Sequence, residues 1–244
     1  MQVKLISNTN LSNTVIAART CYNSFSKTKG NYKTPTDDIT EDDKDLLNRL
    51  LFKNKHESVF EHLVYTFKIE GIPRYTLQEL ARHRIASYSV KSTRYCTSKE
   101  LRSEKPFESE VEENSVSFDD ETLRRAGKYI YITENEAVNA LNILQLEMLR
   151  TAIENGITSD IVKPLIPESF KTDLVWTINL RSLRNFIKLR LHKSAHSEIR
   201  KLANLIFDNI PQAHKFLFED LNDNVWTIRR TLVSIKRHQY SKGY

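Results

Sequence analysis

Residues 81–96 have the sequence ARHRIASYSVKSTRYC, the most informative stretch in the chain. From Arg82 to Arg94 it holds three arginines, one histidine, one lysine and four serine or threonine hydroxyls. Guanidinium groups are planar, permanently charged and forked, so they match phosphate oxygens in pairs, and hydroxyls can complete such a cradle. The stretch therefore indicates a site for a phosphorylated ligand. Composition alone favours two plainer alternatives, a solvated basic turn or a contact to nucleic acid, because most charge runs lie on the surface.

The bulk composition is that of a globular, basic protein. Its 244 residues, 39% of them hydrophobic and 28% charged, fit one large domain or two small ones and suffice for a buried core. The net charge of +6 favours anionic ligands or nucleic acid. The first residues, MQVKLISNTN, lack the apolar core of a signal peptide, and no apolar run has the length of a membrane span. We therefore expect a cytoplasmic protein with reduced thiols and no membrane partner.

Glycine and cysteine usage exclude several common sites. The five glycines lie far apart, whereas the dinucleotide-binding fingerprint and the P-loop both need clustered glycines for the backbone to approach phosphate. The two cysteines, Cys21 and Cys96, form no CxxC pair, which excludes a zinc ribbon and a thioredoxin-like motif. A nucleotide cofactor, if bound, must therefore be held by side chains.

Hydrophobic periodicity predicts an α+β fold. Residues 63–70 alternate between apolar and polar side chains, which is typical of a strand, and Gly71 and Pro73 are expected to end it. Residues 24–40 and 100–121 are expected to be loops. Further strands are expected at 3–6 and 174–179, and helices at 14–20, 41–53, 75–84, 123–154 (one or two), 182–191, 197–207 and 214–221. We predict a single domain over residues 1–244, with a mixed or antiparallel sheet flanked by long helices and a basic C-terminal extension from about residue 222.

A second motif, HESVFEH at residues 56–62, directly precedes the 63–70 strand. Two histidines and two carboxylates in seven residues are potential metal ligands. Their spacing is not the His-Glu-x-x-His of zinc proteases, and no cysteine joins them. We therefore expect no metal site.

The third motif is WTINLRSLRNFIKLR at residues 176–190. Arg181 and Asn185 are four residues apart and share a helix face, whereas Arg190 lies nine residues beyond Arg181, on the opposite side. One straight helix cannot direct all three side chains at one point, but a symmetric oligomer can, because different subunits supply different faces to one site. An amphipathic helix with exposed arginines is the plainer alternative.

Together the three motifs resemble the signatures of the flavin-dependent thymidylate synthases. The family pattern that matches the 81–96 stretch is Arg-His-Arg, then seven residues, then Ser, with Arg two residues after that Ser. The pattern His-Glu-Ser/Thr-x-Phe-Glu-His matches residues 56–62. The pattern Asn-x-Arg-Ser-Leu-x-Asn-Phe, followed by Leu-Arg, matches the third motif. The resemblance extends from about Ala17 to Leu205. It implies reductive methylation of dUMP to dTMP, with methylenetetrahydrofolate as carbon donor and NADPH-reduced FAD as hydride source. It also implies a homotetramer with active sites between subunits and no nucleic-acid partner.

The resemblance also assigns residues to roles. Arg190 is implied to be the catalytic residue, a fixed cation where negative charge develops on the pyrimidine. The implied FAD-binding residues are His56, Ser58, Glu61, Arg82, His83, Arg84, Asn179, Arg181 and Asn185. The implied dUMP-binding residues are Gln78, Glu79, Arg82, Ser92, Thr93, Arg94, Lys163 and Arg190.

The chain departs from the family pattern at several positions. Ser89 and Val90 stand where the family commonly has Asn-Glu, Glu79 where a Gln is usual, and Cys21 where a flavin-contacting Ser is often found. Lys163 replaces a frequent Arg, which keeps the charge but loses the fork. Ser92 is expected to bind phosphate or backbone rather than to act as a nucleophile, because a serine nucleophile needs an adjacent base.

One alternative function belongs to another class. A basic nucleic-acid-binding protein without catalysis would use the stretch from Arg82 to Arg94, together with the basic C-terminal tail, on a phosphate backbone. A visible spectrum distinguishes the two, because oxidised flavin absorbs blue light and a nucleic-acid-binding protein is colourless.

Overall fold

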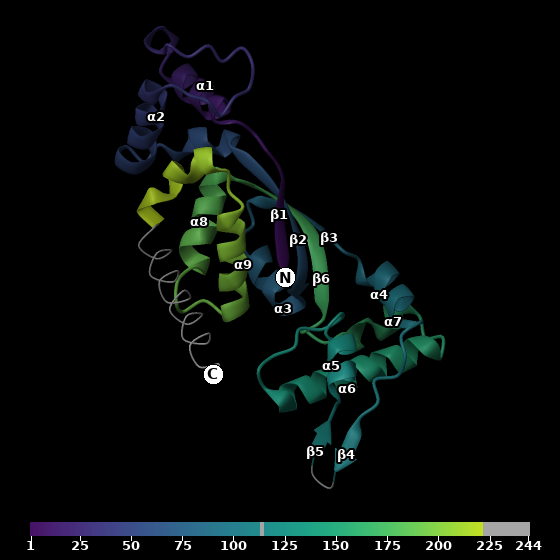
Figure 1. The fold of residues 1–244 in the computed structure, drawn as a ribbon. Helices are drawn as coiled ribbons and strands as arrows, with labels where there is room; N and C mark the ends of the chain where they lie inside the picture. Colours follow the sequence, from purple (N-terminus) through teal and green to yellow (C-terminus); the bar gives the residue numbers. More distant parts are fainter. Residues whose placement is uncertain (113–114, 222–244) are drawn as a thin grey trace. The chain divides into compact units, whose positions relative to one another are not determined.

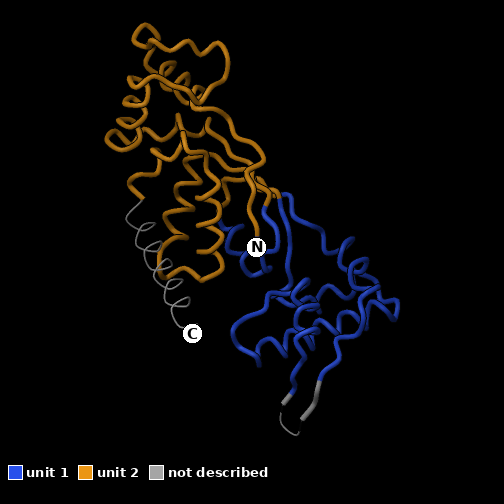
Figure 2. Tube along the Cα trace, viewed as in Figure 1, with its two compact units in different colours: residues 1, 69–82, 89–174 blue, residues 2–68, 83–88, 175–244 orange. Residues whose placement is uncertain are grey.

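The computed structural model describes residues 1–112 and 115–221, and the predicted C-terminal extension lies outside these described residues. The described chain has the expected α+β architecture (Figure 1). It divides into two compact units, which Figure 2 distinguishes by colour. Unit 1 comprises Met1, Ile69–Arg82 and Ser89–Leu174, and unit 2 comprises Gln2–Lys68, His83–Tyr88 and the chain from Val175 onward.

A four-stranded sheet has the strand order β1-β2-β6-β3. Its strands are β1 (Gln2–Asn8), β2 (Val64–Pro73), β6 (Lys171–Asn179) and β3 (Ala86–Val90). Three backbone hydrogen bonds each join the residue after one strand to the beginning of its neighbour: Thr9 N–H to Val64 O at 2.9 Å, Leu180 N–H to Leu63 O at 2.7 Å, and Lys91 N–H to Asp173 O at 2.8 Å. Neighbouring strands therefore run antiparallel, one of the two sheet types that the sequence allowed.

The expectation that Gly71 ends the second strand was wrong, and one strand was not predicted. Strand β2 continues through Gly71 to Pro73, because Gly71 adopts a φ of +70° and its N–H donates to Asp173 Oδ1 at 2.8 Å. Strand β3 lies inside the basic stretch and was not predicted, because its charged flanks hide the short alternation of Ala86–Val90.

Unit 2 contains the helices that follow the N-terminal and C-terminal strands. They are α1 (Leu11–Cys21), α2 (Glu41–Asn48) with a π-helical turn at Arg49–Lys53, the 3-10 segment η3 (Glu57–His62), α8 (Leu180–Arg190), α9 (Ser197–Asp208) and the 3-10 segment η5 (Gln212–Leu221). Helix α8 packs against α9 and η3, and α1 packs against η3. Phe186 and Trp176 are fully buried, so the apolar face of α8 is set against strand β6.

Unit 1 has its own hydrophobic core, with Leu101, Phe107, Ile143 and Leu149 among its members. Its elements are α3 (Arg74–Ala81), α4 (Thr93–Leu101), β4 (Glu110–Glu112), β5 (Ser115–Ser117), α5 (Asp120–Ala126), α6 (Glu136–Glu154), α7 (Ser159–Val162) and a 3-10 turn at Lys163–Leu165. The loop expected at 100–121 was wrong, because the segment holds the end of α4, an antiparallel β4–β5 hairpin and the start of α5. Leu101 and Phe107, which are buried in this segment, are too sparse among charges to form a visible period.

A buried carboxylate anchors α1 and the segment that follows it. Asp43, fully buried in α2, accepts hydrogen bonds from Arg19 Nε at 3.0 Å and Nη2 at 2.5 Å through Oδ1. Its Oδ2 accepts from the hydroxyls of Thr28 at 2.5 Å, Tyr32 at 2.6 Å and Thr40 at 2.9 Å. Thr40 is also the N-cap of α2 and accepts from Asp43 N–H. One side chain thus connects α1, α2 and the 24–40 loop.

We expect Asp43→Asn to destabilise the protein by about 3–5 kcal/mol, because it leaves the Arg19 charge buried without its counter-charge. Urea unfolding followed by circular dichroism measures the change. Asp42→Asn is the matched control, since Asp42 is exposed and its Oδ2 lies 4.0 Å from the exposed Lys29 Nζ. The control should change stability by less than about 0.5 kcal/mol. Equal unfolding midpoints for both variants would contradict the anchoring role.

The stabilising effect of Asp43 should also depend on pH. Burial acts to raise the pKa of Asp43, but the hydrogen bonds from Thr28, Tyr32, Arg19 and Thr40 outweigh it and leave the pKa lowered. A lowered folded-state pKa stabilises the fold above the unfolded-state value, about 3.9, and the effect disappears as the pH falls through the folded-state pKa. The difference in the free energy of unfolding between wild type and Asp43→Asn should be constant from about pH 7 to 5 and decrease below about pH 4. A difference in the free energy of unfolding that already decreases near neutral pH would refute this assignment to the Asp43 carboxylate.

Candidate functional site

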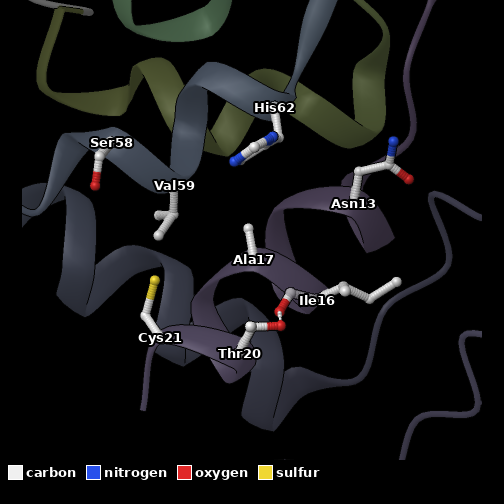
Figure 3. A pocket seen from close by; sticks show the side chains of 8 residues that line it. All are labelled: Asn13, Ile16, Ala17, Thr20, Cys21, Ser58, Val59 and His62. Carbon is white, nitrogen blue, oxygen red and sulfur yellow. Dashed lines mark hydrogen bonds between the residues drawn. The ribbon is translucent and has the colours of Figure 1, made fainter. Parts of the chain in front are cut away.

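Helix α1 and the second motif enclose a pocket of about 520 Å³ in unit 2 (Figure 3). Its lining residues are Asn13, Ile16, Ala17, Thr20, Cys21, Ser58, Val59 and His62. Ser58, expected from the sequence to contact a flavin, is among them, and so is Cys21, one of the departures from the family pattern. An apolar strip accompanied by hydroxyls, an amide and an imidazole suits an aromatic ligand with polar edges, such as a flavin ring.

His56 lies beside the end of α1. The Tyr22 hydroxyl is 2.5 Å from His56 Nδ1, and the two rings stack with their centroids 6.2 Å apart. Tyr22 is the residue after α1, next to the pocket residue Cys21. Sequence reasoning missed Tyr22, because nothing in the pattern relates it to a histidine 34 residues later.

Arg181 joins the third motif to the second. Its Nη1 donates to Glu61 Oε1 at 2.7 Å, and its Nε lies 3.3 Å from Glu57 Oε2. The hydrogen bond to Glu61 is the main cause of the raised pKa of Arg181, and burial acts against it. Because the Arg181 and Glu61 side chains are 52% and 45% exposed, this pair orients the guanidinium more than it stabilises the fold.

The other residues of the third motif have distinct local roles. Asn179 is the N-cap of α8, and its Oδ1 accepts from Ser182 N–H at 2.9 Å. Asn185 is exposed on α8, one turn beyond Arg181. Arg184 is structural, because it donates to the Leu217 carbonyl and to both carboxylate oxygens of Asp220.

Arg190, the last residue of α8, contacts a different element from Arg181. Its Nε donates to His83 Nε2 at 3.0 Å. The His83 ring in turn meets Phe186 edge-on, with centroids 5.0 Å apart. Arg181 thus contacts η3, whereas Arg190 contacts the Arg-His-Arg motif. These different partners agree with the opposite helix faces that the spacing of the two arginines predicts.

In unit 1 the end of the basic stretch forms the start of α4. Ser92 is the N-cap of this helix, but its side chain makes no capping hydrogen bond, and Thr93 is the first helical residue. Arg94 Nε lies 3.0 Å from Asp160 Oδ1 of α7, with the two side chains 60% and 58% exposed. The hydroxyls of Ser98 and Ser159 are also hydrogen-bonded, so α4 and α7 meet at two polar contacts.

Sequence reasoning missed Asp160, because no local pattern relates α7 to α4. The exposed Lys163 follows directly after α7. The Gln78 side-chain amide donates to Glu168 Oε2 at 2.9 Å. Arg82 is the exposed C-cap of α3, which ends three residues before the predicted helix end, and Arg84 is exposed after it.

The two predicted residue sets divide between the units. The predicted FAD-binding residues in unit 2 are His56, Ser58, Glu61, His83, Arg84, Asn179, Arg181 and Asn185, with Arg82 in unit 1. The predicted dUMP-binding residues in unit 1 are Gln78, Glu79, Arg82, Ser92, Thr93, Arg94 and Lys163, with Arg190 in unit 2.

Two absences within the described residues bear on other classes of function. Within residues 1–112 and 115–221, no group of three or more His, Cys, Asp or Glu side chains is arranged to hold a metal ion. Over the same ranges, no helix combines the length and the apolar composition needed to cross a membrane.

Comparison with known proteins assigns the family. A family model described as "Thymidylate synthase complementing protein" matches residues 4–214. The flavin-dependent thymidylate synthase of Wolinella succinogenes is 47% identical over 218 residues, 89% of this chain and 97% of the relative. That of Campylobacter jejuni is 48% identical over 219 residues, 90% of this chain and 96% of the relative.

A solved structure agrees with these relatives. The crystal structure of thymidylate synthase X (ThyX) from Helicobacter pylori with FAD and dUMP is similar at a TM-score of 0.79 and 39% identity, covering 90% of this chain and 98% of that one. The motifs thus point to an enzyme rather than to the alternative of a non-catalytic nucleic-acid-binding protein. The chain belongs to the flavin-dependent thymidylate synthase family.

Proposed function

We propose that this protein binds FAD and dUMP and converts dUMP to dTMP, with methylenetetrahydrofolate as carbon donor and NADPH as reductant. One observation carries the proposal: over 90% of the chain, it is similar in fold and 39% identical to a protein solved with FAD and dUMP. The flavin, when bound, supplies the hydride for the methylation.

The phosphate of dUMP binds at the start of α4. The first N–H groups of a helix favour an anion, and the uncapped Ser92 hydroxyl adds another donor there. Arg94 supplies a forked cation and Lys163 a point charge. The ion pair of Arg94 with Asp160 is largely exposed and therefore weak, so a phosphate carrying about −1.5 to −2 charges displaces the carboxylate.

The pyrimidine of dUMP binds at Arg190. Addition of hydride to the ring places negative charge on its carbonyl and N3, and a permanent cation at that point stabilises the transition state more than the ground state. Arg190 suits this role because it is a permanent cation, and its hydrogen bond to His83 involves only the Nε–H of the guanidinium.

The flavin binds at the pocket between α1 and η3 and at the exposed residues of α8. Ser58 lines the pocket, and His56 is held beside it by Tyr22. Asn179 uses its side-chain oxygen as a helix cap, so its amide N–H2 is the group suited to the flavin. Glu61 acts through Arg181, its ion-pair partner, rather than directly.

We also propose a homotetramer in the cytoplasm, with each site formed by more than one copy. The opposite directions of Arg181 and Arg190 on α8 support such sharing, because a symmetric assembly brings different faces of one helix to one ligand.

We expect Arg190→Ala to retain the flavin but to lower dTMP formation by about 10²–10³-fold, the usual cost of one lost transition-state contact. The flavin absorbance per protomer and single-turnover formation of dTMP, each compared with wild type, test both statements. Unchanged turnover in the variant would refute the role of Arg190. A colourless wild type that forms no dTMP would refute the proposed function itself.

The phosphate site predicts a preference for dUMP over deoxyuridine. We expect Arg94→Ala to remove most of that preference, because a charge-assisted hydrogen bond contributes about 1.5–3 kcal/mol. Asp160→Asn is the matched control: it breaks the same ion pair but leaves the guanidinium, so it should keep the preference. Calorimetric titration with both ligands measures it. If both variants lose this preference equally, the ion pair between Arg94 and Asp160, and not a contact of Arg94 with phosphate, is responsible for it.

A further inference from the structure

We propose that His83 is a positioning residue that orients the guanidinium of Arg190. The inference rests on the proposed function, because it concerns the contact of Arg190 with the pyrimidine. It gives His83 a task other than the flavin contact that the family resemblance implies.

The contact itself defines the state of both side chains. Arg190 Nε donates to His83 Nε2 at 3.0 Å. An arginine remains protonated at all working pH values, so the imidazole nitrogen must be the acceptor, and His83 is neutral with its proton on Nδ1. The bond uses only the Nε–H of Arg190 and none of its four Nη–H groups. Since the guanidinium is planar, fixing Nε fixes the plane in which those Nη–H groups point.

His83 is itself held by a closed series of contacts within unit 2. Its ring meets Phe186 edge-on at 5.0 Å, Phe186 meets Trp176 at 5.1 Å, and Trp176 lies 6.4 Å from Tyr88, all measured between ring centroids. The Tyr88 hydroxyl then donates to the His83 carbonyl at 2.7 Å. Because Phe186 and Trp176 are fully buried, both the ring and the backbone of His83 are fixed by the core.

The consequence concerns direction rather than charge. Without His83 the Arg190 side chain, the last of its helix, keeps its charge but loses the acceptor of its Nε–H. Transition-state stabilisation depends on donors already aimed at the developing charge. The loss should therefore appear mainly in kcat and only slightly in the KM for dUMP.

The experiment compares two substitutions that separate the ring from the acceptor. His83→Phe keeps an aromatic ring against Phe186 and removes the acceptor, whereas His83→Gln keeps an acceptor on a side chain of similar reach. Single-turnover dTMP formation in His83→Phe should be about 10–100-fold slower than in wild type, with its flavin absorbance retained. His83→Gln should recover most of the loss. In an Arg190→Ala background, His83→Phe should add no further loss.

A structural readout accompanies the kinetics. In crystals of His83→Phe the Arg190 guanidinium should leave the position it holds in wild type, and in His83→Gln it should keep it. If His83→Phe does not fold, His83→Asn, which is too short to reach Arg190, takes its place.

Several outcomes would overturn the inference while leaving the proposed function intact. The first is that His83→Phe lowers the rate of dTMP formation equally in the wild-type and Arg190→Ala backgrounds, and the second is that His83→Phe is slow because it has lost its flavin. The third is that His83→Gln is as slow as His83→Phe, and the fourth is that the Arg190 guanidinium keeps its wild-type position in the His83→Phe crystal. A wild type that forms no dTMP would refute the proposed function and this inference with it.

Discussion

The junction between β6 and α8 is the constraint on which the candidate site depends. Strand β6 ends at Asn179 and α8 begins at the next residue, with Asn179 Oδ1 accepting from Ser182 N–H. The N–H of Leu180 donates to the Leu63 carbonyl, directly after the second motif. The direction of α8 relative to its strand and to η3 is therefore set within a few residues. Each contact that Arg181 and Arg190 make follows from that direction.

Charged side chains at the candidate site already have partners in the protein. Arg181 pairs with Glu61, Arg94 with Asp160, and Arg190 donates to His83. An anionic ligand must therefore exchange partners rather than meet isolated cations. The exchange costs little at exposed pairs, where solvent screens the attraction. At Arg190 the contact with His83 is to an imidazole nitrogen rather than to a carboxylate.

Stability and the pocket between α1 and η3 are connected through Asp43. The carboxylate joins α1 to α2 and to the 24–40 loop, and α1 supplies all of the pocket lining that η3 does not. A buried carboxylate is costly unless its oxygens are satisfied, and here Arg19 and three hydroxyls satisfy them. A loop without regular structure beyond one 3-10 turn is thus held by polar contacts rather than by an apolar face.

The amino-acid sequence by itself determined the α+β class, most helix positions and the family, because motif spacing and hydrophobic period are local properties of the chain. It also determined that Arg181 and Arg190 lie on opposite sides of α8, since helix geometry alone requires this. Only the tertiary structure decided the partners: Tyr22 for His56, Asp160 for Arg94 and His83 for Arg190. It also decided that β3 joins the sheet and that Leu101 and Phe107 are buried. These depend on contacts between residues far apart in the sequence, which no local pattern encodes.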